Sequence, residues 1–204
     1  APTDVDGIFE VPDRRLRSPQ RALQVPNGLL LDIPPYARTY SASQTRGFWF
    51  TAPVDFRIVG LNVPNELNQA VQNVEVFIMD QPPASFPSFS SGGSVFYTNL
   101  ESAGQVIATD IAVQAGKIVG ILGAAGNGSM RNSYASVNNF PSSINGSPVV
   151  LTRFGAQQAI SSASTVQYFT ELSDSTPVSR VEMYYTVVSH LLIVLFAGSI
   201  KLYA

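Results

Sequence analysis

The residue types that support nucleophilic or metal-assisted catalysis are scarce in this chain. His190 is the only histidine, and there is no cysteine. A serine–histidine–acid triad would have to use His190. Because His190 lies at the start of an apolar segment that is a poor place for a rigid catalytic pocket, we interpret it as a histidine at a strand end with a local hydrogen bond. A single histidine without cysteine leaves only oxygen ligands for a metal ion. The sequence therefore predicts no enzyme activity, no metal and no cofactor.

Carboxylates are the remaining candidates for acid–base catalysis or calcium binding. The fragment Asp4-Val5-Asp6-Gly7 with Glu10 is similar to part of a calcium loop, but it lacks the third ligand position and the spacing to the terminal glutamate. Glycoside hydrolysis needs two carboxylates at one cleft, and nothing in the sequence brings a pair together. The available set is Asp55, Glu66, Glu75, Asp80, Glu101 and Asp110.

Exposed aromatic residues and sequons indicate contact with sugars or with a neighbouring subunit. Phe86 and Phe89 lie in the loop PPASFPSFSSGG, where we expect exposure and packing against a neighbour. Asn127 and Asn145 each begin an Asn-Gly-Ser sequon and are possible glycan sites. The aromatic residues that could form a sugar-stacking face are Trp49, Tyr36, Tyr40, Phe86, Phe89, Phe96 and Tyr97. A β-sandwich core explains Trp49 and Phe96 better.

Residues 1–28 differ in character from the rest of the chain. Four arginines fall within eight residues, and prolines recur through the segment: Arg14, Arg15, Arg17 and Arg21, with Pro2, Pro12, Pro19 and Pro26. Proline breaks helices and has no N–H to donate to a neighbouring strand, so we expect an extended arm. Its arginines would clamp a second subunit by pairing with carboxylates on that subunit's surface. A formal net charge of −2 and the lack of aromatics among the arginines argue against nucleic acid.

Composition favours an exported β-protein. Hydrophobic residues make up 45 % of the 204 residues and charged residues 13 %, about half the usual charged share. Such a surface tolerates close packing against copies of itself. The sequence begins Ala1-Pro2, typical of a mature chain after signal-peptide removal. We therefore expect a secreted protein at or outside the cell surface.

From residue 29 to 186 the pattern is typical of an all-β domain. Short strands alternate with turn clusters rich in Gly, Pro and Asn, which predicts a single jelly-roll-like or Greek-key β-sandwich. One polar face and one apolar face alternate clearly over Arg180–Thr186. The predicted strands are Gly47–Thr51, Phe56–Val63, Val74–Met79, Val95–Thr98, Val106–Ala108, Lys117–Leu122, Val149–Phe154, Val166–Thr170 and Ser179–Val188.

The end of the chain, residues 187–204, is an apolar segment that we expect to form a strand. Its unbroken apolar run extends from Leu191 to Ala197, shorter than the roughly 20 residues of a membrane span. The segment either closes its own sheet or acts as a donor strand for another subunit, and the second interpretation is favoured. The expected interface residues are Leu191, Leu192, Ile193, Val194, Leu195, Phe196, Ile200 and Leu202.

Two stretches carry a resemblance to a known group. The first is Ile33-Pro34-Pro35-Tyr36 with Thr45-Arg46-Gly47-Phe48-Trp49-Phe50-Thr51-Ala52-Pro53-Val54-Asp55-Phe56; the second is Pro177-Val178-Ser179-Arg180-Val181-Glu182-Met183-Tyr184-Tyr185. Together they resemble secreted bacterial β-sandwich proteins of the PEP-CTERM-associated type. Phe48 stands where that group usually has tyrosine, and the tail lacks a Pro-Glu-Pro box. The resemblance implies an extracellular or matrix location and no enzyme activity.

These observations leave two main hypotheses for function. The first is a structural subunit of an extracellular fibre, a head-to-tail homopolymer linked by terminal strands. The alternative is a secreted monomeric module that binds carbohydrate or belongs to a biofilm matrix. A membrane anchor is less favoured, because Lys201 lies in the segment and no basic cluster follows it.

Overall fold

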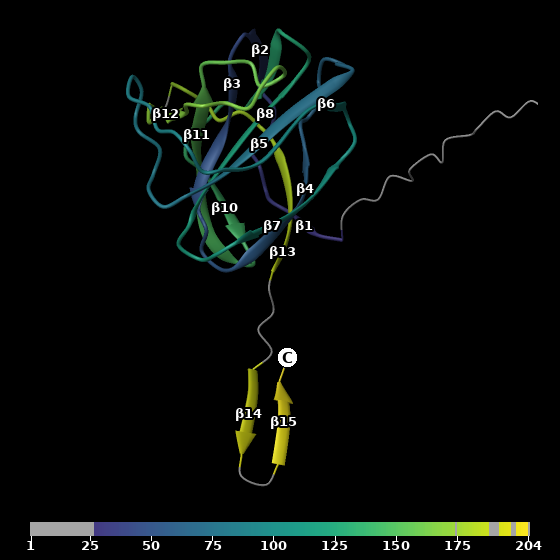
Figure 1. Ribbon diagram of the computed structural model, residues 1–204, viewed down its shortest axis with the longest axis vertical. Coiled ribbons are helices and arrows are strands. Elements are labelled where there is room, and N and C mark those ends of the chain that lie inside the picture. Colours follow the sequence, from purple (N-terminus) through teal and green to yellow (C-terminus); the bar gives the residue numbers. More distant parts are fainter. Residues whose placement is uncertain (1–26, 174, 188–191, 197–198, 204) are drawn as a thin grey trace, which may run out of the picture.

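The computed structural model describes residues 27–173, 175–187, 192–196 and 199–203. The described residues are all-β, which confirms the predicted fold class. The predicted arm with its four arginines (Arg14, Arg15, Arg17 and Arg21) lies outside the described residues. The strands of residues 29–187 form one domain, and the last two strands form a separate hairpin (Figure 1).

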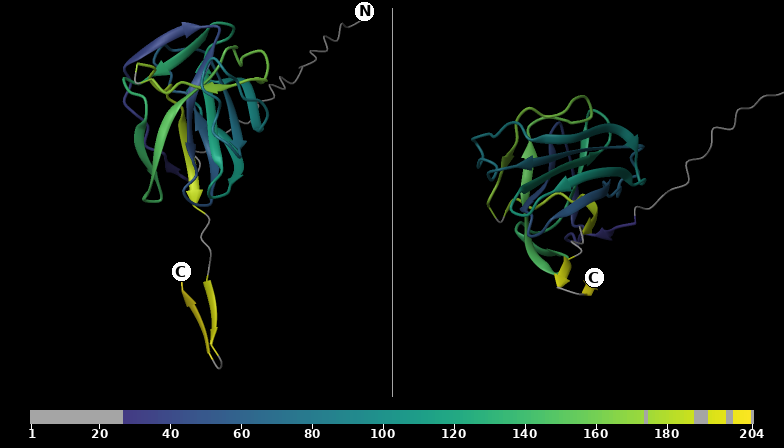
Figure 2. Two further views of the ribbon diagram at one scale, coloured as in Figure 1. Left: turned by 90° about the vertical axis from the view of Figure 1, so that its left-hand side faces the viewer. Right: turned by 60° about the horizontal axis from the view of Figure 1, so that its bottom comes forward.

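Two antiparallel sheets build the domain (Figure 2). The smaller sheet has the order β1 (Leu29–Leu30), β13 (Glu182–Val187), β4 (Phe56–Asn62) and β7 (Ile107–Val113). The larger has the order β10 (Phe140–Ile144), β11 (Ser147–Ala156), β3 (Thr45–Thr51), β8 (Ile118–Ala125), β5 (Val71–Met79) and β6 (Ser94–Ser102). Attached to this path are β12 (Phe169–Thr170), β2 (Arg38–Ala42) and β9 (Met130–Tyr134).

The main hydrophobic core lies between the two sheets. On β13 the predicted alternation is confirmed, because Met183 and Tyr185 are buried while Glu182 and Tyr184 are half-buried. Phe56 of β4 packs edge-on against Tyr185, with ring centroids 6.0 Å apart. The large side chains that are fully buried in this cluster include Phe48, Phe50, Phe56, Leu31, Ile58, Leu61 and Ile121. Each contributes about 1.5–3 kcal/mol of burial free energy relative to exposure.

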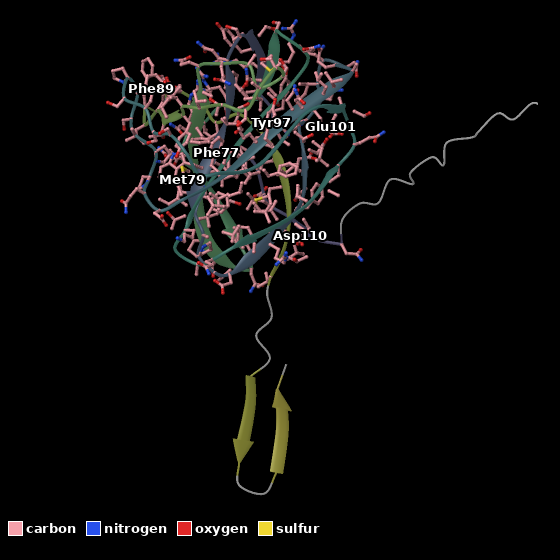
Figure 3. All side chains as sticks on the ribbon, viewed as in Figure 1. Phe77, Met79, Phe89, Tyr97, Glu101 and Asp110 are labelled. Atoms are coloured by element: carbon pink, nitrogen blue, oxygen red, sulfur yellow. The ribbon has the colours of Figure 1, made fainter. Side chains whose placement is uncertain are left out.

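A second core covers the other face of the larger sheet. Phe77 and Met79 of β5 lie in it (Figure 3), and they pack with Phe154 and Tyr168. The two faces explain why β8 reads as a continuous apolar run, since every one of its residues is buried. Gly47 of β3 permits the close approach of β8, because a Cβ there would lie 1.8 Å from the carbonyl oxygen of Ile121.

Every strand predicted within the domain overlaps an observed one, although the bounds differ. The segment Val166–Thr170 is reduced to the two residues of β12, and the strand expected at Val106–Ala108 continues to Val113. Four strands escaped prediction: β1, β2, β9 and β10. β1 has two residues, and the other three carry polar residues or proline in place of a clear apolar face.

Arg180 connects the two sequence stretches that carried the resemblance. Its guanidinium pairs with Glu66, and its Nε donates to the carbonyl oxygen of Pro34 at 2.9 Å. It also lies 5.9 Å from the ring centroid of Tyr36. The arginine therefore fixes the chain after β1 against the residues that precede β13, a structural role.

The C-terminal segment differs from the single strand predicted for residues 187–204. β13 ends at Val187, and two further strands, β14 (Leu192–Phe196) and β15 (Ser199–Tyr203), pair as an antiparallel hairpin. At one end of the hairpin Phe196 pairs with Ser199. The prediction of one continuous strand was wrong because length and composition do not distinguish one long strand from two short ones.

No helix long and apolar enough to span a membrane occurs in the part of the chain that the structure describes.

Candidate functional sites

The β14–β15 hairpin contains most of the residues predicted for the subunit interface. Leu192, Ile193, Val194, Leu195 and Phe196 form β14, and Ile200 and Leu202 belong to β15, while Leu191 lies outside the described residues. The pairs Ile193–Leu202 and Leu195–Ile200 share one face by strand alternation. The opposite face has the pairs Leu192–Tyr203, Val194–Lys201 and Phe196–Ser199. One face is thus wholly aliphatic in sequence, and the other carries the lysine.

Among the described strands, β14 and β15 pair with no strand except each other. The domain forms its two sheets and its main core from residues 29–187 alone. The hairpin is therefore not needed to complete a sheet of its own domain.

Three edges at the ends of the two strand orders, β10, β6 and β7, carry features that oppose pairing with another chain. β10 contains Pro141, which has no N–H to donate. β6 pairs with β5 through two register shifts. β7 carries Asp110, whose carboxylate pairs with Arg57 on β4 at 2.5 Å. Proline, bulges and charges are the usual means of blocking an edge.

The edge at the remaining end, β1, carries none of these features in its described residues. Its two residues, Leu29 and Leu30, are 56 % and 51 % exposed, and they pair with Tyr185 and Tyr184 without a shift in register. Because β1 is so short, Thr186 and Val187 have no strand partner on that side among the described residues. The two side chains of this edge are therefore apolar and exposed.

The aromatic loop before β6 is exposed as predicted. Phe86 and Phe89 retain 48 % and 39 % exposure, and Phe89 lies at the periphery of the domain (Figure 3). Both rings contact Phe169, with centroids 5.2 and 5.6 Å away. Trp49 is half-buried beside the second core and donates from Nε1 to Thr170, and Phe96 packs against the main core. These contacts favour the core interpretation of Trp49 and Phe96.

A pocket of about 330 Å³ lies at the end of the domain formed by β2, β3, β9 and β11. We call it the arginine–tyrosine pocket. The residues that line it are Arg38, Tyr40, Gln44, Arg46, Tyr134, Arg153, Ser175, Thr176 and Pro177. Arg38 and Tyr40, two residues apart on β2, share one face of the strand, and Arg38 pairs in register with Tyr134 of β9.

Two buried asparagines hold the strands that carry this pocket. Asn132 accepts from the backbone N–H of Arg46 at 2.8 Å and donates to the carbonyl oxygen of Gln44 at 2.9 Å. Asn138 accepts from the backbone N–H of Arg153 at 2.9 Å. These bonds fix the backbone at Arg46 and Arg153, and with it the points from which the two buried arginine side chains extend.

The two buried arginines differ in their partners. Arg153, 8 % exposed, pairs through Nε with Glu171 and donates from Nη1 to the carbonyl oxygen of Pro177. Arg46, 5 % exposed, donates to four neutral acceptors: the carbonyl oxygens of Thr45 and Ala156 and the side-chain oxygens of Gln44 and Gln157. Burial lowers the pKa of Arg46 from its ordinary value.

The predicted glycan acceptors lie in exposed turns. Asn127 and Asn145 are both exposed, in the turns before β9 and between β10 and β11. Within the described residues no group of three or more His, Cys, Asp or Glu could hold a metal ion. Glu75 is fully buried and accepts from Ser94, Ser164 and the backbone N–H of Thr165.

Sequence reasoning identified the terminal apolar segment and Tyr40, but it missed the arginines of the pocket. The available signal was the alternation Arg38-Thr39-Tyr40, which places both long side chains on one face of a strand. That signal was lost because β2 was not predicted. Comparison of the chain with protein-family models, with curated proteins and with solved structures gives no match.

Proposed function

We propose that this protein is the structural subunit of an extracellular fibre, in which the C-terminal hairpin of one copy docks on the β1 edge of the next. One observation carries the proposal: the hairpin has one face that is wholly aliphatic in sequence and, among the described strands, no partner in a domain that forms its sheets without it. Residues of this kind need burial, and a second copy of the chain supplies an apolar edge.

The energetics favour a partner for the hairpin. A two-stranded hairpin by itself is marginally stable in water. Burying the four aliphatic residues of one face, Ile193, Leu195, Ile200 and Leu202, contributes on the order of 6–12 kcal/mol before entropy costs. New backbone hydrogen bonds along the β1 edge would fix the orientation of the hairpin in this contact.

The geometry of the contact determines the assembly. The hairpin and the β1 edge are different surfaces of the same chain, so the interface is heterologous and propagates into a filament unless rotation closes a ring. Because the main core is already filled, the hairpin adds to an edge and does not replace a missing core strand. This differs from the donor-strand insertion that the sequence suggested.

The remaining sequence expectations fit the same proposal. The arginine-rich arm of residues 1–28 would clamp a neighbouring copy, and the resemblance to secreted β-sandwich proteins supports an extracellular location. Exposure of Asn127 and Asn145 supports glycan attachment there. The alternative, a monomeric carbohydrate-binding module, depends on the arginine–tyrosine pocket, which a fibre subunit can also carry.

Cysteine trapping tests the proposed contact, because the chain has no cysteine of its own. Protein carrying Leu29→Cys is mixed with protein carrying Lys201→Cys, or in parallel Val194→Cys, and oxidised. We expect disulfide-linked pairs in at least one mixture and none when Asp110→Cys on β7 replaces Leu29→Cys. Equal linkage at both edges would contradict the choice of β1. Linkage within a single chain of the double variant, at high dilution and without linkage between copies, would contradict the fibre.

A further inference from the structure

The arginine–tyrosine pocket has more positive charge than its described surroundings neutralise. Three guanidinium groups line it, those of Arg38, Arg46 and Arg153. Of the described carboxylates, Glu171 alone forms an ion pair with one of them, through Arg153. Asp174, beside the lining residue Ser175, lies outside the described residues. The pocket is thus a local cationic site on a chain whose formal net charge is −2.

Several donors in the pocket are unoccupied among the described residues. The guanidinium of Arg38, the Nη2 of Arg153 and the hydroxyls of Tyr40 and Tyr134 take part in no hydrogen bond with them. Arg46 lies deeper, where burial lowers its pKa and so disfavours its charged form. An anion in the pocket would offset that desolvation and accept from the unoccupied donors.

The shape and the aromatic walls narrow the class of ligand. A volume of about 330 Å³ is at the small end of ligand pockets. Tyr40 is 57 % exposed, and its ring lies 6.5 Å from that of Tyr134 at an interplanar angle of 47°. Tilted rings do not form a slot for a flat base. They present one face on which a sugar ring can stack, with Gln44, Ser175 and Thr176 as polar partners for hydroxyls.

We propose that this pocket binds a sugar that carries a carboxylate, such as one hexuronate residue of an acidic polysaccharide. Arg38 and Arg153 hold the carboxylate, Arg46 supplies a buried positive charge behind it, and Tyr40 stacks on the pyranose ring. Guanidinium groups match a planar carboxylate through paired hydrogen bonds. In a fibre, each subunit would then carry one site for an acidic glycan, a property that self-assembly does not require.

The test compares two probes that differ only at C6. The full-length protein is titrated with methyl β-glucuronide, methyl β-glucoside and inorganic phosphate, and binding is followed by ligand-observed NMR. We expect the glucuronide to bind at least tenfold more tightly than the glucoside, and more weakly as salt is added. Equal binding of the two sugars, or no binding of either, would overturn the proposal. Phosphate binding as tightly as the glucuronide would show a general anion site and would also overturn it.

Two exposed residues test the assignment without disturbing the core. Arg38→Gln should weaken glucuronide binding about tenfold and leave the urea midpoint of unfolding unchanged, because Arg38 has no partner among the described residues. Tyr40→Ser should weaken binding of the glucuronide and of any bound glucoside. Arg131→Gln, at a half-buried arginine whose side chain donates to Ser129, is the matched control and should bind like the unchanged protein. Unaltered binding in Arg38→Gln would place the carboxylate elsewhere.

Discussion

The sandwich domain and the C-terminal hairpin are both rich in apolar residues, but the two regions differ in the strands that they have as partners. In the domain each apolar face meets another: Phe56 of the small sheet packs against Tyr185 and Phe50, and the outer face of β8 is covered by the second core. Among the described strands, β14 and β15 have only each other. The difference teaches that hydrophobicity in one part of this chain builds a fold, while in the other part we propose that it serves contact with a second copy.

Substitution in the domain core should have the largest effect on folding. Phe48→Ala removes a fully buried ring from the main core and should lower the free energy of unfolding by about 3–5 kcal/mol. Urea denaturation measures this loss. Val150→Ala, at a residue 51 % exposed on β11, is the control and should change stability by less than about 0.5 kcal/mol. Similar losses at the two positions would contradict the packing described here.

Substitution in the hairpin should affect assembly and leave domain stability unchanged. Leu195→Glu places a charge on the aliphatic face, opposite Ile200, and should raise the critical concentration for polymerisation at least tenfold. Val150→Glu, at a residue 51 % exposed on β11 and outside the proposed contact, is the control and should change that concentration less than threefold. Light scattering against protein concentration gives both values. A Leu195→Glu protein that polymerises normally would remove the hairpin from the interface.

A smaller effect is expected where the domain uses charge in place of apolar packing. Glu66→Gln removes the negative partner of the largely buried Arg180 and should cost about 2 kcal/mol of stability. Asp110→Asn breaks the exposed pair with Arg57 and should cost less than about 1 kcal/mol. Thermal unfolding of both variants measures the difference. A loss at Asp110 as large as that at Glu66 would show that burial does not decide the strength of these pairs.

The sequence predicted the domain better than its sites, for reasons of periodicity. Alternation on β13 and the continuous apolar run of β8 are local signals, so the class of fold and most long strands were accessible. β2 and β9 are polar and are positioned by contacts distant in sequence, such as the bond from the Arg46 N–H to Asn132. The pocket between them depends on that pairing, and no local sequence pattern predicts the pocket.

The C-terminal end of the chain shows a second feature that the sequence did not predict. An apolar run from Leu191 to Ala197 correctly indicated a strand, but length and composition do not distinguish one long strand from two short ones. The pairing of Phe196 with Ser199 decides in favour of a hairpin. The change matters for the proposed contact, because a hairpin offers two strands where one was expected.

The central claim is that the sandwich folds alone and that the hairpin links copies. Its most direct test is to compare the full chain with a chain ending at Val187, by urea denaturation and by negative-stain electron microscopy at equal concentration. The account predicts long uniform fibres from the full chain, and a monomeric shortened protein with the same urea midpoint as unpolymerised full-length protein. Discrete monomers from the full chain, fibres from the shortened one, or a shortened protein that fails to fold would contradict it.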